Sequence, residues 1–180
     1  MPEFIETTTA AVEWMQGMAG AAEAKGLGVQ WCFATPTDVL AALDMPAVTN
    51  FRVSLDFCYG ESYLIGLGSL LVWSLGARPS KDTLWSTDNG HFIVPGCPWT
   101  RDHEEVAAPL HVALALFSTG PVGFSDLLNH TNASLLNRTV AASGLLLQPS
   151  KAITDVDSAL ASPANEYGDK GYVYATYVEQ

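Results

Sequence analysis

The chain has 180 residues, 48% of them hydrophobic and only 15% charged, and its formal net charge is −11. A chain of this length and aromatic content can bury a core, which excludes an intrinsically disordered protein. Eight basic residues against nineteen acidic ones disfavour both nucleic acid and an anionic membrane surface as partners. The cysteines, Cys32, Cys58 and Cys97, are odd in number and form no CxxC pair, so we expect buried thiols and no disulfide framework.

Strand-like and helix-like segments alternate along the first 144 residues. The strand-like segments are short runs of β-branched and aromatic residues, whereas the helix-like ones carry apolar residues at helical spacing or on nearly all sides. Glycine or proline ends several of them. The predicted strands, in chain order, are Val29–Ala34, Val48–Phe57, Asp82–Thr87 and Val122–Phe124. The predicted helices are 6–25, Val39–Leu43 with Thr37 or Asp38 as its cap, Ser62–Leu75, Glu104–Phe117 and Ser134–Ala142.

This alternation predicts the fold class. Strands separated by helices indicate parallel βαβ units. Because a full (β/α)8 barrel needs about 250 residues, four units suffice for half a barrel or a small open sheet. After residue 144 the alternating segments Ile153–Val156 and Tyr172–Val178 are typical of β-structure. We therefore expect an α/β fold, with a partial (β/α)8 barrel over 1–144 and the truncated start of a β-rich domain over 145–180.

The familiar cofactor and metal signatures do not occur. Gly66-Leu67-Gly68 lies inside an apolar helix, without the third glycine and the preceding strand of a dinucleotide site. His103-Glu104 begins like a zinc-protease helix, but the next histidine, His111, follows after eight positions and not after four. We expect no cofactor and no metal, and we expect the histidines to be structural or to face solvent.

Polar residues gather where the predicted strands end, which is where parallel βα folds hold their catalytic groups. Carboxylates and an arginine lie beside aromatic rings there. Such a rim suits a neutral sugar, whose ring faces stack on the aromatic side chains while its hydroxyls form hydrogen bonds. The candidate carbohydrate-binding residues are Arg52, Trp31, Trp85, Asp88 and Asp126. For Asp88 and Asp126 the alternative is that each caps the helix that follows its strand.

Asp56 is the candidate catalytic residue. It lies at the end of a predicted strand among Leu55, Phe57 and Cys58, and a carboxyl group in apolar surroundings is a candidate general acid. The alternative is a structural ion pair with Arg52. Four residues of extended strand separate two side chains by roughly 13 Å, so a direct pair requires the chain to bend.

Several segments, taken in chain order, carry a family resemblance. They are Arg52-Val53-Ser54-Leu55-Asp56-Phe57, Asp82-Thr83-Leu84-Trp85-Ser86-Thr87, the run from Ser118 to Asp126, and the later Leu135-Leu136-Asn137-Arg138 with Gly144-Leu145-Leu146. Over about residues 29–150 this order resembles the C-terminal half of the barrel in the α-galactosidase and raffinose-synthase group of (β/α)8 glycosidases, most closely its uncharacterised animal members. The resemblance implies that Asp56 is the acid/base residue and that the substrate is an α-linked galactoside or a related sugar.

The resemblance leaves out the nucleophile of that group. A retaining glycosidase needs a second carboxylate roughly 5 Å from its acid/base residue. The group carries this carboxylate in a Lys-x-Asp run on strand four, and no such run precedes Val29. We therefore expect a fragment of a glycoside-hydrolase-like protein that is inactive alone. Its open sheet edges, above all Val29–Ala34, predict self-association or pairing with a missing half.

Two alternatives to this interpretation remain open. One is a non-catalytic carbohydrate-binding or structural α/β module, and the other is a small α/β domain whose sheet is completed by dimerisation. The first residues are acidic where a signal peptide is basic, so we expect no signal peptide in this chain. The sequons at Asn129, Asn132 and Asn137 nevertheless fit a longer parent protein that is secreted.

Overall fold

A computed structural model of the chain describes residues 9–32, 34–57, 64–87, 107–157 and 173–179. These residues form a mixed α/β arrangement with a three-stranded sheet and a two-stranded sheet. The helices are α2 (Ala10–Glu23), α3 (Pro36–Ala41), the 3-10 turn η1 (Ala42–Asp44), α4 (Gly66–Ser74), α5 (Ala108–Phe117) and α6 (Ala133–Asn137). The strands are β1 (Val29–Trp31), β2 (Val48–Arg52), β3 (Arg78–Ser80), β4 (Thr154–Asp155) and β5 (Tyr174–Ala175).

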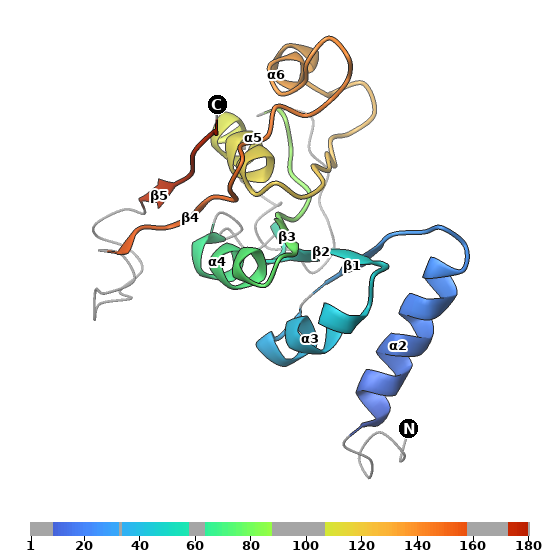
Figure 1. Cartoon of the computed structure of the whole chain (residues 1–180). Coiled ribbons are helices and arrows are strands. Elements are labelled where there is room, and N and C mark those ends of the chain that lie inside the picture. Colours follow the sequence, from blue (N-terminus) through green and yellow to red (C-terminus); the bar gives the residue numbers. More distant parts are fainter. Residues whose placement is uncertain (1–8, 33, 58–63, 88–106, 158–172, 180) are drawn as a thin grey trace.

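The larger sheet has the order β1-β2-β3, and both of its strand pairs are parallel. Trp31 of β1 lies opposite Phe51 of β2, and Arg52 of β2 lies opposite Ser80 of β3. Helix α3 connects β1 to β2 and helix α4 connects β2 to β3, so the three strands form two consecutive parallel βαβ units (Figure 1). Three parallel strands fit a barrel and an open sheet alike, and the partial (β/α)8 barrel stays a prediction.

The strands differ from their predicted bounds: β1 ends at Trp31 and not at Ala34, and β2 and β3 differ more. The sequence predicts one strand over Val48–Phe57, but β2 ends at Arg52 because the chain bends around Ser54. The sequence also predicts a strand over Asp82–Thr87, whereas β3 covers Arg78–Ser80. The prediction for β2 starts at the correct residue but runs too far, and the prediction for β3 lies too far along the chain, since both followed apolar residues that pack beyond the point where the ladder of hydrogen bonds stops.

The fourth predicted unit lies beside the third. Leu84 forms an isolated parallel bridge with Phe124, the one position of the predicted strand Val122–Phe124 that pairs. The backbone N–H of Leu84 donates to the carbonyl of Gly123 at 3.1 Å, and the N–H of Ser125 donates to the carbonyl of Leu84 at 2.9 Å. The strand expected here is therefore reduced to a single bridge that continues the parallel order.

A capping box begins helix α3. The hydroxyl of Thr35 accepts from the backbone N–H of Asp38 at 3.3 Å, and the Asp38 carboxylate accepts from the backbone N–H of Thr35 at 2.7 Å. Pro36 fits the first helical position because the N–H that it lacks has no helical partner there. The prediction that Thr37 or Asp38 caps this helix is wrong, since the helix begins at Pro36.

The sheet has an apolar face and a polar face. Phe51 is only 2% exposed and faces the helices, where it packs in a cluster with Met15 and Ala19 of α2, Val39 of α3 and Val72 of α4. Because side chains alternate along a strand, Asn50 and Arg52 point to the other face. On that face the Ser80 hydroxyl donates to the Asn50 side-chain oxygen at 3.3 Å. The face of β2 and β3 that is turned away from the helices therefore carries a row of buried polar side chains.

The C-terminal segments pack against α4 and α5. Strands β4 and β5 are antiparallel, with Asp155 opposite Tyr174. Ile153 joins Ile65 and Leu114 in a small core cluster, and its backbone N–H donates to the carbonyl of Phe117 at 2.9 Å. The predicted division of the chain at residue 144 stays a prediction.

Two further observations concern exposure. Cys32 is an exposed free thiol, so the expectation of a buried side chain is wrong for it, whereas Cys58 and Cys97 lie outside the described residues. Within the ranges that the structure describes, none of the helices has the length and apolar composition needed to cross a bilayer.

Candidate functional site

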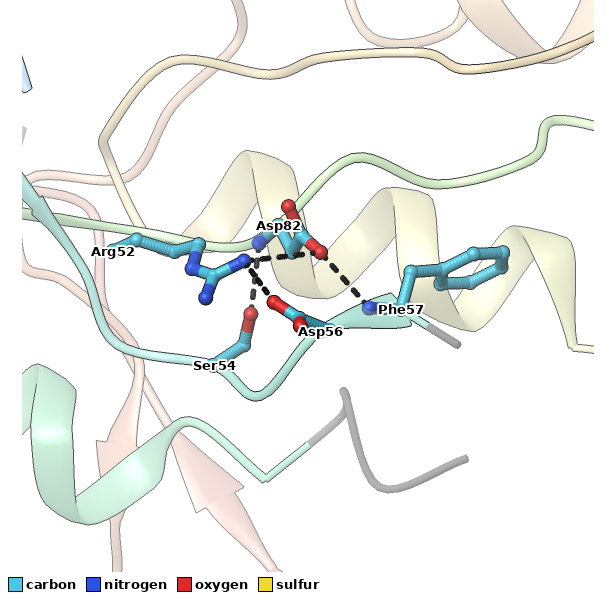
Figure 2. A network of polar contacts seen from close by, with 5 residues as sticks. All are labelled: Arg52, Ser54, Asp56, Phe57 and Asp82. Carbon is cyan, nitrogen blue, oxygen red and sulfur yellow. Dashed lines mark hydrogen bonds and ion pairs between the residues drawn. The ribbon is translucent and has the colours of Figure 1, made fainter. Parts of the chain in front are cut away.

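Arg52 binds two carboxylates at the point where β2 and β3 end. Its Nη1 atom lies 2.6 Å from Oδ1 of Asp56 and 3.2 Å from Oδ2 of Asp82. Figure 2 shows the guanidinium group directed toward both side chains, with Ser54 and Phe57 completing a network of polar contacts. The carboxyl ends of two adjacent parallel strands therefore carry one cation and two anions. We call Arg52, Ser54, Asp56 and Asp82 the strand-end network.

Backbone groups hold this network in place. The backbone N–H of Asp82 donates to the hydroxyl of Ser54 at 2.8 Å, and the backbone N–H of Phe57 donates to Oδ2 of Asp82 at 2.8 Å (Figure 2). The N–H of Val53 also donates to the carbonyl of Ser80 at 2.9 Å. These bonds fasten the turn after β2 to the segment after β3, which is why the chain bends there and does not continue as a strand.

The network is partly buried. The Arg52 side chain is 6% exposed, against 21% for Asp82 and 35% for Asp56. Burial disfavours the charged guanidinium, but the hydrogen bond that Arg52 donates to Asp56 and the charge of Asp82 outweigh it and raise the pKa of Arg52 above its ordinary value. Arg52 with its two carboxylates carries a formal charge of −1, so the guanidinium is already engaged by anions of the chain itself.

The geometry limits what Asp56 can do in this arrangement. Because one nitrogen contacts both carboxylates, the two contacting oxygens are no more than about 6 Å apart, close to the separation that retaining glycosidases use. In such an enzyme the sugar lies between the carboxyl groups, whereas here Nη1 of Arg52 occupies that space. Asp56 and Asp82 therefore form an ion-pair cluster, which is the structural alternative that the sequence left open for Asp56.

The other candidate sugar-binding residues fall into separate environments. Trp85 is 4% exposed, and its ring packs edge-on against Phe57 with centroids 5.0 Å apart. Trp31 packs with the cluster of the helix-facing side, and the centroid of its ring lies 6.4 Å from that of Trp14 on α2. Asp88 lies outside the described residues.

Asp126 forms a second polar contact between strand ends. Its Oδ1 accepts from the backbone N–H of Ser86 and its Oδ2 from the Ser86 hydroxyl, both at 2.7 Å. The Ser86 hydroxyl in turn accepts from the backbone N–H of Asn132 at 2.8 Å. Both carboxylate oxygens of Asp126 are thus used to fasten the segment before α6 to the segment that follows β3.

A buried cation and an imidazole lie beside Phe57. Nζ of Lys81 is 5.2 Å from the centroid of the Phe57 ring, and the ring of His111 packs edge-on against the same residue at 5.4 Å. Lys81 is 4% exposed and His111 is 6% exposed. Burial and the nearby charge of Lys81 lower the pKa of His111 to about 4, so the imidazole is neutral at neutral pH.

Ser54, Asp82 and His111 were not among the predicted site residues. Asp82 belongs to a segment that the sequence assigns to a strand, and its position at a strand end becomes visible only once β3 is placed over Arg78–Ser80. The order of polar residues at alternate positions, Asn50, Arg52 and Ser54, is the signal in the sequence for a polar face on β2.

A pocket of about 400 Å³ adjoins the strand-end network. Arg52 and Ser54 form part of its wall, and the remaining lining is apolar. The apolar lining residues come from the end of β1, from α3, from β2 and the turn after it, and from α4; they are Ala34, Val39, Phe51, Val53, Leu55, Leu64, Gly68, Leu71 and Val72. The pocket therefore lies between the carboxyl end of the sheet and its covering helices.

Comparison with family models, with curated proteins and with solved structures finds no match for the chain. Among the described residues, no three histidine, cysteine or acidic side chains come together as metal ligands. The chemistry of the site is consequently interpreted from the chain's own residues, their distances and their burial.

Proposed function

We propose that the chain carries the sugar-binding end of a glycosidase-like (β/α)8 protein. The observation that supports this proposal is the strand-end network, in which Arg52, Asp56 and Asp82 converge at the carboxyl ends of two adjacent parallel strands. That edge of a parallel βα sheet is where such folds bind their ligands. Carboxylate oxygens and a guanidinium group at one place are acceptors and donors for the hydroxyls of a polyol.

In this proposal Asp56 contacts the sugar directly. With 35% of its side chain exposed, it is the most accessible member of the ion-pair cluster and can accept a hydrogen bond from a sugar hydroxyl. Asp82, which accepts from both Arg52 and the Phe57 backbone, holds the cluster together. Asp56 becomes a proton donor only when a second carboxylate from outside this chain lies across the sugar. Trp85, Asp88 and Asp126 remain proposed neighbours of that sugar.

The same geometry leads us to propose that the chain alone does not hydrolyse a glycoside. Asp82 is near enough to Asp56 to serve as the second carboxylate, but the guanidinium of Arg52 fills the space where the sugar ring has to lie. We therefore propose sugar binding without turnover for this chain.

A second candidate function is a carbohydrate-binding or structural module that is non-catalytic in any context. The ion pair at 2.6 Å between Arg52 and Asp56 favours it, because a structural cluster of this kind fixes the strand ends and needs no further role. The two functions differ in whether added carboxylate-bearing chain restores turnover.

The test combines binding and turnover on the full chain. We expect methyl α-galactoside to bind in calorimetry and an aryl α-galactoside to remain uncleaved. Asp56→Asn should weaken the binding about tenfold, as the loss of a charge-assisted hydrogen bond does. Asp44→Asn, at an exposed position in η1, is the matched control and should leave binding unchanged. An absence of sugar binding contradicts the proposed function, and cleavage that Asp56→Asn abolishes contradicts the predicted lack of turnover.

A further inference from the structure

The pocket and the strand-end network share a wall. Arg52 and Ser54 belong to both, and each is at least nine-tenths buried, at 7% and 6% exposed. Arg52 contacts the carboxylates of Asp56 and Asp82, while the rest of the pocket lining beside Arg52 and Ser54 is apolar. A ligand that contacts this wall therefore meets a polar region and an apolar region next to each other.

The charge of the wall selects the polar part of such a ligand. Arg52 is already balanced by two carboxylates, which leaves a formal charge of −1 on the ion-pair cluster. An anionic headgroup such as a phosphate or a carboxylate has to compete with Asp56 and Asp82 for the guanidinium, whereas hydroxyl groups can donate to the acidic oxygens. The head of the ligand is therefore neutral and rich in hydroxyls.

The size and composition of the pocket select the other part of the ligand. Its volume of about 400 Å³ lies within the roughly 300–1,000 Å³ range of small-molecule sites. Phe51, Leu55, Leu71 and Val72 are among its lining residues, and they offer no hydrogen-bonding side chain. A polar group in this space has few partners and loses its hydration, so the pocket favours a compact alkyl or aryl group.

We propose that the pocket binds the apolar aglycone of a glycoside whose sugar lies on the strand-end network. This inference rests on the proposed function and adds the substrate class to it. The ligand is an alkyl or aryl glycoside, and its apolar group enters between Ala34 of the first unit and Leu71 of α4. An oligosaccharide composed of sugars alone does not use this pocket.

The experiment measures the affinity of the full chain for three ligands by calorimetry, below any micelle-forming concentration. They are methyl α-galactoside, hexyl α-galactoside and hexanol. We expect the hexyl glycoside to bind at least roughly tenfold more tightly than the methyl glycoside, since several additional methylenes leave water. Hexanol, which lacks the sugar, should bind much more weakly than the hexyl glycoside.

Substitutions test whether the higher affinity for the hexyl glycoside comes from the pocket. Ala34→Phe adds bulk at the pocket wall and should abolish the difference in affinity between the hexyl and methyl glycosides. Leu67→Phe, on the outward side of α4 at 65% exposure, is the matched control and should preserve the difference. Circular dichroism of both variants confirms that they fold, and the ligand series on the unaltered chain needs no variant.

Each other outcome overturns the inference in a recognisable way. Equal affinity for the hexyl and methyl glycosides contradicts the aglycone pocket and leaves the proposed sugar site intact. Binding of hexanol as tight as that of the hexyl glycoside, with no binding of the methyl glycoside, contradicts the proposed function together with the inference. A hexyl gain that persists in Ala34→Phe and in a second pocket variant, Leu71→Trp, places the alkyl group elsewhere and contradicts the inference alone.

Discussion

Nη1 of Arg52 lies 2.6 Å from Oδ1 of Asp56, although four residues of extended strand separate two side chains by roughly 13 Å. The contact exists because β2 stops at Arg52 and the chain turns back through Ser54 toward Phe57. The turn is held from the neighbouring segment, where Asp82 accepts from the backbone N–H of Phe57 and from Arg52 itself. One buried guanidinium thus holds together the ends of two strands.

Removal of this guanidinium should destabilise the fold. Arg52→Met leaves Asp56 and Asp82 as neighbouring carboxylates without their cation. We expect the free energy of unfolding to fall by about 2 kcal/mol, less than the 3–5 kcal/mol typical of a fully buried pair because both carboxylates keep some solvent contact. Urea denaturation measures the change. Arg138→Met, at an exposed position, is the control, and equal effects of the two variants would contradict the role of Arg52.

Gly120 marks the closest approach between β3 and the segment that follows α5. A Cβ at this position would overlap the carbonyl oxygen of Pro79 and would lie 2.7 Å from Cβ of Ser80. Because part of this overlap is with backbone, Gly120→Ala should lower the free energy of unfolding by about 2 kcal/mol, as overpacking does.

The matched control for this substitution is Gly17→Ala in α2, where nothing lies within 4 Å of the added Cβ. That change should stabilise the chain by up to about 1 kcal/mol, since alanine is the better helix former. Thermal unfolding of both variants gives the comparison. A neutral Gly120→Ala would mean that the two segments are less closely packed than described.

The strand-end network shows what the sequence could and could not predict. The choice of Arg52 and Asp56 followed from their place near a strand end, and the structure brings these two residues together. The sequence did not predict Asp82 as their partner, because the apolar pattern placed a strand over the segment that contains it. Ladder hydrogen bonds, unlike hydrophobic periodicity, depend on the neighbouring strand, and only the pairing with β2 shows that β3 ends at Ser80.

The start of α3 is a local example of a boundary that the sequence alone leaves ambiguous. The predicted strand Val29–Ala34 stops just before Thr35-Pro36, since a proline is typical of the end of a strand. The same two residues form the N-cap and the first position of the helix, because proline suits both a strand terminus and a first helical turn. Local chemistry therefore allowed two boundaries, and the reciprocal bonds between Thr35 and Asp38 decide between them.

His111 should make the stability depend on pH in a defined window. Its pKa is about 4 in the folded chain, against an ordinary value of 6.5, because the imidazole is buried and close to Lys81. Between these values the unfolded chain binds a proton that the folded chain does not. The free energy of unfolding should therefore rise with pH from about 4 to 6.5, by roughly 3–4 kcal/mol at most, and this contribution is lost on acidification through the same window.

The measurement is urea denaturation at several pH values for the unaltered chain, for His111→Gln and for His130→Gln. The carboxylates titrate in all three, so the difference between the curves isolates each imidazole. His111→Gln should flatten the dependence between pH 4 and 6.5, whereas His130→Gln, at an exposed position, should not. Parallel curves for the unaltered chain and His111→Gln would show that His111 does not titrate abnormally.

The edge of β1 should mediate self-association. Within the described part of the chain β1 pairs on one side alone, with β2, so the other side offers backbone donors and acceptors to a further strand. Large apolar side chains lie near this edge, with Trp14 54% exposed beside Trp31 and Leu27 61% exposed just before the strand. A net charge of −11 opposes the contact between two copies, so added salt should strengthen it.

Sedimentation velocity should therefore show a sedimentation coefficient that rises with protein concentration and further with salt. Leu27→Glu should weaken the association several-fold, whereas Leu128→Glu, which makes the same charge change at an 89% exposed position in the loop before α6, should have only the small effect of the added charge. A single monomeric species at all concentrations and salt levels, or equal effects of the two variants, would show that this edge is not an interaction surface.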